Sequence, residues 1–247
     1  MNKIQLLKQS LKIKYPLKEK YITVIPLNIY QTWYTKNLNI DMANNIIKIK
    51  RNNPAFNYQL FDDDDCRNFI KNNFETNVLK TFDTLIPGAY KADLWRYCIL
   101  YINGGIYLDI KYSQRNNFKF INLTEKEHLV MDAGNNGIYN ALMVCKPKNN
   151  LLIRAINKIV ENVNNRYYGE NCLDPTGPLL LWKIITTDEK IDMIDMKHEF
   201  FFNNFNYRYI FFNNYLVIGS YNNYLLNNKN PKKENYGVLW NKRQIYK

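Results

Sequence analysis

Apolar and polar positions along the chain follow two different periodicities. Within residues 150–163 the apolar side chains Leu152, Ile156 and Ile159 recur every three or four positions, which predicts an amphipathic helix. Runs rich in β-branched and aromatic residues predict strands, beginning with residues 21–31, which Pro26 interrupts. Strands and helices alternate without a linker or an internal repeat, so the pattern predicts an α/β protein.

The same patterns predict the remaining elements. Further helices are expected over residues 40–52, 87–102 and 179–185, and another directly after the four aspartates at 62–65. We interpret those aspartates as a helix cap and not as a metal cluster. Further strands are expected over residues 58–61, 106–112, 128–132, 138–145, 199–202, 208–212 and 215–219. Residues 1–20 combine helical spacing with frequent lysines, so the chain divides into a basic lead, 1–20, and one α/β domain, 21–247.

Composition excludes several classes of protein. An apolar content of 46% argues against a disordered chain, and no run of about 18 apolar residues is present that would span a membrane. The N-terminus has no apolar signal region, so a soluble, cytoplasmic protein is expected. Four widely spaced cysteines are expected as reduced thiols, mostly in the core: Cys66, Cys98, Cys145 and Cys172.

The net charge of +12 raises a different function class, a nucleic-acid-binding protein. The lysines concentrate near both termini without a recognised binding motif, so no specific nucleic acid partner is expected. The chain also contains 39 Asn, which indicates an AT-rich genome and is compatible with a virus-encoded protein in the host cytoplasm. This bias makes asparagine a poor marker of functional sites.

The side chains best suited to chemistry lie in residues 91–112. Asp93 and Arg96 are three positions apart on a predicted helix and therefore share a face. Tyr107, Asp109 and Lys111 alternate with apolar residues on the following predicted strand and share its polar face. Two interpretations are open: the group binds a polyhydroxylated, anionic ligand, or it is a surface ion pair beside an edge strand.

In this order, these residues resemble the core signature of glycosyltransferase family 32. That family has a DXD-containing sugar-binding region, includes fungal mannosyltransferases and is related to the clostridial glucosylating toxins. The matching residues are Ala92, Asp93, Arg96, Gly104, Gly105, Tyr107 and Asp109, with further matches at Ile25-Pro26, Gln31-Thr32-Trp33 and Asn53-Pro54. The resemblance covers roughly residues 22–185. It implies a single GT-A-like nucleotide-sugar-binding domain, in which helices flank a mixed central sheet.

The resemblance also implies an activity. A glycosyl group would pass from a UDP- or GDP-sugar to a hydroxyl of a glycan or glycoconjugate acceptor, with retention of the anomeric configuration. No residue stands out as a covalent nucleophile, so front-face attack is preferred. The resemblance places four residues in catalysis: Asp93, Arg96, Asp109 and Lys111. His128 and His198 lie outside this group and are given no catalytic role.

Binding roles follow from the same resemblance. Asp93 and Arg96 would hold the donor sugar, Tyr107 would shape the donor site, and Asp109 would approach the ribose or a metal ion. Aromatic residues would contact the rest of the donor, with Tyr30 or Trp33 at the nucleobase and Trp240 over the diphosphate. Thr176 and Gly177 would line the acceptor side. Simple packing is the alternative for both tryptophans, and a helix-start turn is the alternative for Thr176-Gly177.

One departure from the family pattern concerns the metal. Lys111 stands where the family has the second Asp of DXD, whose carboxylates position a divalent ion against the diphosphate. Three interpretations are open: Asp109 still holds Mn²⁺ or Mg²⁺, Lys111 itself neutralises the diphosphate, or the protein is a catalytically silent sugar-nucleotide binder. Retained catalysis is preferred, with Asp109 as the expected metal ligand.

Overall fold

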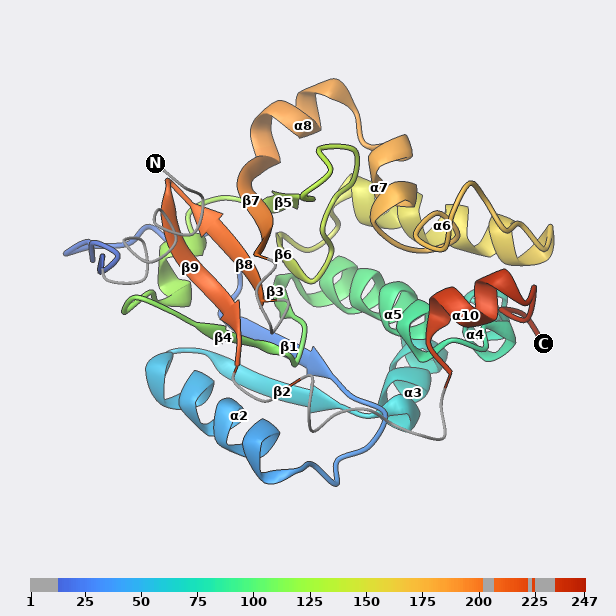
Figure 1. The fold of residues 1–247 in the computed structure, drawn as a ribbon, viewed down its shortest axis with the longest axis horizontal. Coiled ribbons are helices and arrows are strands. Elements are labelled where there is room, and N and C mark those ends of the chain that lie inside the picture. Colours follow the sequence, from blue (N-terminus) through green and yellow to red (C-terminus); the bar gives the residue numbers. More distant parts are fainter. Residues whose placement is uncertain (1–12, 202–206, 222–223, 225–233) are drawn as a thin grey trace.

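The structure is a computed structural model that describes residues 13–201, 207–221, 224 and 234–247. At its centre is a four-stranded sheet with the order β2-β1-β3-β6 (Figure 1). β1 pairs in parallel with β2 and β3, while β3 pairs antiparallel with β6. The predicted mixed sheet is therefore confirmed. The strands are β1 (Asn28–Thr32), β2 (Asn57–Phe61), β3 (Gly105–Leu108) and β6 (Leu142–Cys145).

A second sheet packs beside the first and has the order β4-β9-β8-β7-β5. β8 and β9 form a hairpin whose two turn residues, Asn213 and Asn214, both have positive φ, a conformation that asparagine tolerates well. The strands are β4 (Tyr112–Gln114), β5 (Leu129–Met131), β7 (Ile194–Phe201), β8 (Tyr207–Phe212) and β9 (Tyr215–Ser220).

Helices flank the central sheet, as predicted (Figure 1). The expected cap before α3 is confirmed, because Asp62 and Asp65 form a reciprocal capping box. Three short helices, α4, α8 and α10, were not predicted. The helices are α2 (Ile40–Asn52), α3 (Asp63–Asn73), α4 (Thr76–Thr84), α5 (Gly88–Asn103), α6 (Asn150–Asn164), α7 (Pro178–Ile184), α8 (Thr187–Met193) and α10 (Tyr236–Asn241), with a 3-10 turn, η1 (Phe120–Leu123).

Successive side chains of the central strands point to opposite faces of the sheet, so the core has two main clusters. Ile29 and Ile106 point from β1 and β3 into a cluster shared with the second sheet. Their neighbours Tyr30 and Tyr107 point to the opposite face, into a cluster shared with α3 to α7. The sheet therefore lies between a helical layer and a second sheet, and the two tyrosines belong to the helical side.

The strand predicted over residues 106–112 ends earlier than expected. β3 stops at Leu108, residues 109–111 form a turn, and β4 then joins the other sheet. The Asp109 amide donates to the Ala141 carbonyl at 2.8 Å and its own carbonyl accepts from Tyr112, which closes the turn. The predicted strand is therefore wrong beyond Leu108, but Tyr107, Asp109 and Lys111 still lie together, because Asp109 is hydrogen-bonded to both of the others.

Other boundaries also differ from the sequence prediction. Of residues 21–31, only those from Asn28 onward form a strand. Of the basic lead, 1–20, the first 12 residues lie outside the described residues. Tyr15 packs edge-on against Phe118, with the two ring centroids 4.8 Å apart. All four cysteines are free thiols. Among the helices that the structure describes, none combines the length and apolarity needed to cross a membrane.

Candidate functional site

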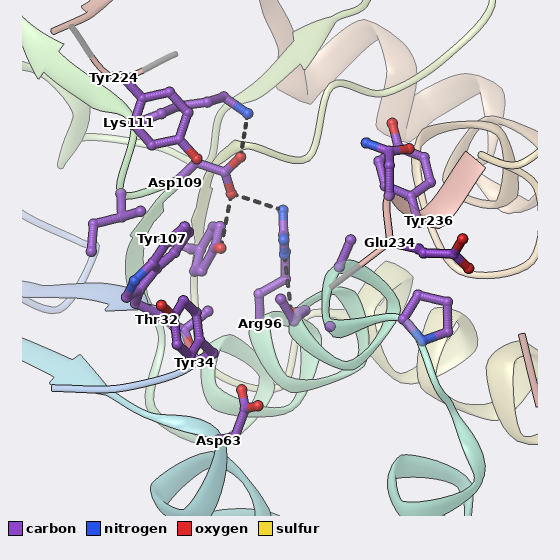
Figure 2. A pocket seen from close by; sticks show the side chains of 17 residues that line it. Thr32, Tyr34, Asp63, Arg96, Tyr107, Asp109, Lys111, Tyr224, Glu234 and Tyr236 are labelled. Carbon is purple, nitrogen blue, oxygen red and sulfur yellow. Dashed lines mark hydrogen bonds and ion pairs between the residues drawn. The ribbon is translucent and has the colours of Figure 1, made fainter. Parts of the chain in front are cut away.

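A two-part cleft opens where the parallel strands β1 and β3 end. Its parts have cavity volumes of about 300 and about 400 Å³ and share a wall made by Arg96, Asp109 and Lys111. Trp33 and Tyr34 follow the end of β1 and line the first part. Figure 2 shows this part of the cleft, with Tyr34 labelled. Ligands of α/β proteins bind at the carboxyl ends of strands because the loops there diverge.

Four charged residues of alternating sign run along this cleft. The Arg96 guanidinium lies 3.3 Å from Asp93 and 3.4 Å from Asp109, and the Lys111 ammonium lies 2.5 Å from the other oxygen of Asp109. Figure 2 shows the second half of this series, from Arg96 through Asp109 to Lys111. The candidate residues of α5 and of the β3–β4 turn therefore form one continuous network, which we call the charge series.

Arg96 is held rigidly at the centre of the charge series. Its Nε donates to the Ala92 carbonyl at 3.1 Å and its Nη1 to the Asn140 carbonyl at 2.7 Å. The guanidinium also stacks over the Tyr107 ring at 4.3 Å. Burial would lower the pKa of Arg96, but Tyr107 and the two carboxylates raise it, so the group stays charged. The helix thus presents a fixed cation to the cleft.

Asp93 is the buried end of the charge series. Its carboxylate accepts from Asn140 Nδ2 at 2.9 Å and from the Thr176 hydroxyl at 2.7 Å. Asn140 Nδ2 also donates to the Tyr97 hydroxyl at 2.7 Å. Burial raises the pKa of Asp93 above its ordinary value, and Arg96 only partly offsets this. Asp93 is therefore oriented by neutral donors and one cation.

Asp109 has a different environment at the centre of the cleft. One oxygen accepts from the Tyr107 hydroxyl at 2.9 Å, and the other accepts from Lys111. Burial acts to raise the pKa of Asp109, but Lys111 and Arg96 together hold it below its ordinary value. In turn, Asp109 raises the pKa of Lys111 against the effect of burial. Both groups are ionised at neutral pH.

Two glycines allow the chain to pass from α5 into β3. Gly104 has φ of 60° and Gly105 has φ of 117°, values that residues with a side chain rarely adopt. A Cβ on Gly105 would lie 2.8 Å from the Asn28 carbonyl oxygen of β1, and one on Gly104 would lie 2.6 Å from Pro147. The Gly-Gly pair therefore lets β3 lie directly beside β1 and brings Asp109 next to Arg96.

The structure gathers most of the predicted site residues in the cleft. Asp93, Asp109 and Lys111 line it, as do the half-buried Trp33 and the backbone of Gly177. Tyr107 contributes its hydroxyl, although its ring is buried. Thr176 is 1% exposed, so its observed contact is the hydrogen bond to Asp93 and not the wall of the cleft.

Two predicted donor contacts do not reach the cleft in the described structure. Tyr30 is 1% exposed and packs in the helical core, where it is hydrogen-bonded to the Asn103 side chain just before β3, whereas the cleft lies at the other end of that strand. Trp240 donates its indole N–H to the Tyr168 carbonyl at 2.6 Å and packs against that same core. Tyr236, four residues earlier, lines both parts of the cleft instead.

The sequence analysis gave no site role to several residues that line the cleft, among them Tyr34, Asn140, Arg208 and Tyr236. Asn140 binds Asp93 through its side chain and Arg96 through its carbonyl, yet it was one asparagine among many. Tyr34 directly follows Trp33, and the two rings lie 5.1 Å apart. Arg208 had no signal, because only the packing of the second sheet brings β8 to the cleft.

The residues around Asp109 do not fit a divalent metal ion. Both of its oxygens already accept from other groups, and the group nearest to it is the Lys111 ammonium, which repels a cation. Within the ranges that the structure describes, no group of three or more His, Cys, Asp or Glu side chains is placed to hold a metal. The Mn²⁺ or Mg²⁺ that the resemblance implies thus has no ligand set among these residues.

Both histidines are buried outside the charge series. The Nδ1 atom of His128 lies 2.8 Å from Asp195, and that of His198 lies 2.9 Å from Asp132. The His198 ring also stacks on Tyr139 at 3.7 Å. This placement agrees with a structural role for both.

An α/β sheet with a charged cleft at its strand ends is typical of proteins that bind nucleotide-like ligands. Comparison with known proteins gives a closer assignment. A family model described as a glycosyltransferase sugar-binding region containing a DXD motif matches residues 40–128. The match confirms the resemblance over these residues, which make up about a third of the chain. The matched region includes α5, β3 and the whole charge series.

Curated relatives agree with this assignment. A glycosyltransferase of Acanthamoeba polyphaga mimivirus is 40% identical over 99 residues, which cover 38% of each chain. Inositol phosphoceramide mannosyltransferase 1 of Schizosaccharomyces pombe is 25% identical over 162 residues, covering 64% of this chain and 50% of that protein. Initiation-specific alpha-1,6-mannosyltransferase of Candida albicans is 28% identical over 110 residues, covering 42% of this chain and 28% of that protein. The matches thus span half or less of these relatives' lengths.

Among solved structures, the PaToxG glycosyltransferase matches with a TM-score of 0.48 at 16% identity, over 64% of this chain and 67% of that one. The ligand-free glycosyltransferase domain of the YGT toxin matches with a TM-score of 0.42 at 10% identity, over 69% and 67%.

Proposed function

We propose that this protein transfers a glycosyl group from a nucleoside diphosphate sugar to a hydroxyl acceptor, with retention. The observation that carries the proposal is the charge series on the shared wall of a two-part cleft, within the region that matches the glycosyltransferase family. The two parts suit a two-part donor, with its nucleoside in one and its sugar in the other. The diphosphate then lies at the wall between them.

Each part of the cleft offers suitable contacts. Trp33 and Tyr34 provide aromatic surface for a nucleobase in the first part. Asp93 and Arg96 face the second part, where a carboxylate accepts from sugar hydroxyls and a guanidinium donates to oxygens. Gly177 and Pro178 close this part on the far side and are proposed to face the acceptor.

The transfer step follows from this arrangement. The bond between the anomeric carbon and the diphosphate oxygen breaks, and its electron pair stays on that oxygen. The acceptor oxygen bonds to the anomeric carbon on the same face, and its proton passes to the leaving phosphate. Asp93 is held by three groups, so it is poorly placed to act as a covalent nucleophile, which favours front-face attack. Arg96 and Lys111 stabilise the negative charge that develops on the diphosphate.

A donor screen tests the proposal. Purified protein is incubated with UDP- and GDP-sugars, including mannose donors because two of the relatives are named mannosyltransferases. Hydrolysis or transfer from one donor that is lost in Asp93→Asn is the expected result. Proton NMR of the fresh product then reports the anomer, and an inverted product would contradict retention.

A catalytically silent sugar-nucleotide binder is the second candidate. The observation that favours it is the Asp109–Lys111 ion pair, which stands where the family has two carboxylates. A silent binder would bind one donor in calorimetry but would not turn it over with any acceptor or with water. Donor turnover above that of Asp93→Asn excludes this candidate.

A further inference from the structure

The net charge of the site differs from that of a DXD site. Asp93 and Asp109 balance Arg96 and Lys111, so the charge series is neutral overall. With Asp in place of Lys111, three carboxylates would face one guanidinium and the same wall would carry a charge of −2. Such a wall repels a diphosphate unless a divalent cation lies between them. Lys111 removes both a metal ligand and the electrostatic need for a metal.

A further cation lies next to this neutral series. Arg208 on β8 is exposed and lines the second part of the cleft, the part to which Lys111 and Asp93 also contribute. It is hydrogen-bonded to Tyr139 and lies over the Phe200 ring at 5.1 Å. In the described part of the chain, no carboxylate forms an ion pair with it. The charge of Arg208 is therefore available to a ligand.

The fold brings Arg208 and Lys111 together from distant parts of the sequence. The Tyr221 amide, just after β9, donates to the Lys111 carbonyl at 3.0 Å, and β9 pairs with both β4 and β8. The two cations are close enough that Arg208 acts to lower the pKa of Lys111. Two like charges facing one open cavity are a favourable site for an anion.

We propose that Lys111 and Arg208 bind the diphosphate of the donor, in place of a divalent cation. This inference rests on the proposed function, since it concerns the same donor site. Lys111 reaches the diphosphate from the shared wall, and Arg208 reaches it from the sheet across the second part of the cleft. Arginine adds a fork of donors that matches phosphate oxygens.

Calorimetric titration with UDP, GDP and inorganic pyrophosphate tests the proposal, in EDTA and again in Mn²⁺. We expect the wild-type Kd for one nucleoside diphosphate to differ by less than about threefold between the two buffers. Lys111→Gln and Arg208→Gln should each weaken binding by about 10- to 100-fold in EDTA, because each removes a charge-assisted contact. The control Lys20→Gln removes one charge from an exposed position and should bind like the wild type.

The variant Lys111→Asp tests whether a second carboxylate makes nucleotide binding dependent on a metal ion. It restores the second carboxylate, so we expect binding to be lost in EDTA and regained in Mn²⁺. Electron paramagnetic resonance should detect bound Mn²⁺ in this variant and not in the wild type. Since Arg208 is exposed, Arg208→Gln keeps the proposal testable even if substitutions at Lys111 impair folding.

The outcomes separate this inference from the proposed function. Nucleoside diphosphate binding that requires Mn²⁺ in the wild type would overturn the inference and leave the proposed function standing. Pyrophosphate binding that depends on both cations, without binding of UDP or GDP, would support the anion site but overturn the proposed function. No binding of any of the three ligands in either buffer would overturn both.

Discussion

Asp93 and Asp109 share one guanidinium, yet their ionisation is shifted in opposite directions. Burial raises the pKa of Asp93, and Arg96 only partly offsets it. Asp109 is subject to the same burial effect, but Lys111 adds a second cation and holds its pKa below the ordinary value. At Asp93 one shared cation does not offset the effect of burial on the pKa, whereas at Asp109 two cations do.

The two carboxylates also differ in what holds them. Asp93 lies within a helix and receives hydrogen bonds from Asn140 and Thr176, two distant parts of the chain. Asp109 lies in a turn and is held by Tyr107 and Lys111, each two residues away. Asp93 is therefore positioned by tertiary structure, and Asp109 largely by its own segment.

Among the substitutions at these contacts, Arg96→Leu should have the largest effect. It removes the cation between two buried carboxylates, so the free energy of unfolding should fall by about 3–5 kcal/mol. Urea denaturation measures this change. Arg67→Leu is the matched control, because it breaks a partly exposed pair with Asp83 and should cost about 0–1 kcal/mol. Equal losses in the two variants would show that Arg96 is not an essential buried partner.

Asn substitutions should separate the two carboxylates by function. Asp93→Asn should lower turnover by about 100-fold while changing nucleotide affinity by less than about threefold, because Asp93 is proposed to contact the sugar. Asp109→Asn should also lower turnover, but in EDTA it should bind the nucleoside diphosphate at least as tightly as the wild type, since it leaves Lys111 unneutralised. Calorimetry and donor hydrolysis measure both. Weaker binding in Asp109→Asn would instead indicate that Asp109 itself contacts the nucleotide.

Thr176→Val should change the environment of Asp93 and leave that of Asp109 as it is. The change keeps the shape of the side chain but removes the donor to the carboxylate, so stability should fall by about 1–2 kcal/mol. Thr176→Ser keeps the hydroxyl and is the matched control. Chemical denaturation at neutral pH measures both, and equal stability of Val and Ser variants would rule out the hydrogen bond as a stabilising contact.

The pH dependence of stability should give the smallest effect, with opposite signs for the two carboxylates. Because the folded pKa of Asp109 is lowered, its contribution is present above the unfolded value of 3.8 and is lost as the pH falls through the folded value. Because the folded pKa of Asp93 is raised, stability falls as the pH rises from 3.8 through the folded value. Each slope is at most about 1.4 kcal/mol per pH unit.

Denaturation at several pH values, with Asp93→Asn and Asp109→Asn as references, checks these slopes. The wild type should lose stability relative to Asp93→Asn as the pH rises above 3.8, and relative to Asp109→Asn as it falls below 3.8. Parallel profiles for all three proteins would contradict the assigned shifts.

Local sequence determined much of the fold and part of the site. Helix α6 follows from the spacing of its apolar residues, and the start of α3 follows from the aspartates that cap it. The segment from Asp93 to Asp109 carries its own signature, since the two glycines impose a backbone that few other residues adopt. These features depend on contacts among near neighbours, which a sequence displays directly.

Long-range contacts of the folded chain determine which other side chains complete the site. Tyr30 and Trp33 looked equally suitable, but Tyr30 points into the core from the strand, while Trp33 follows the strand end and lines the cleft. Asn140 lies in the turn before β6 and Arg208 lies on β8, and both join the cleft through the pairing of strands within the two sheets. Long-range pairing leaves no periodic trace in a single sequence, because each strand carries only its own half of the contact.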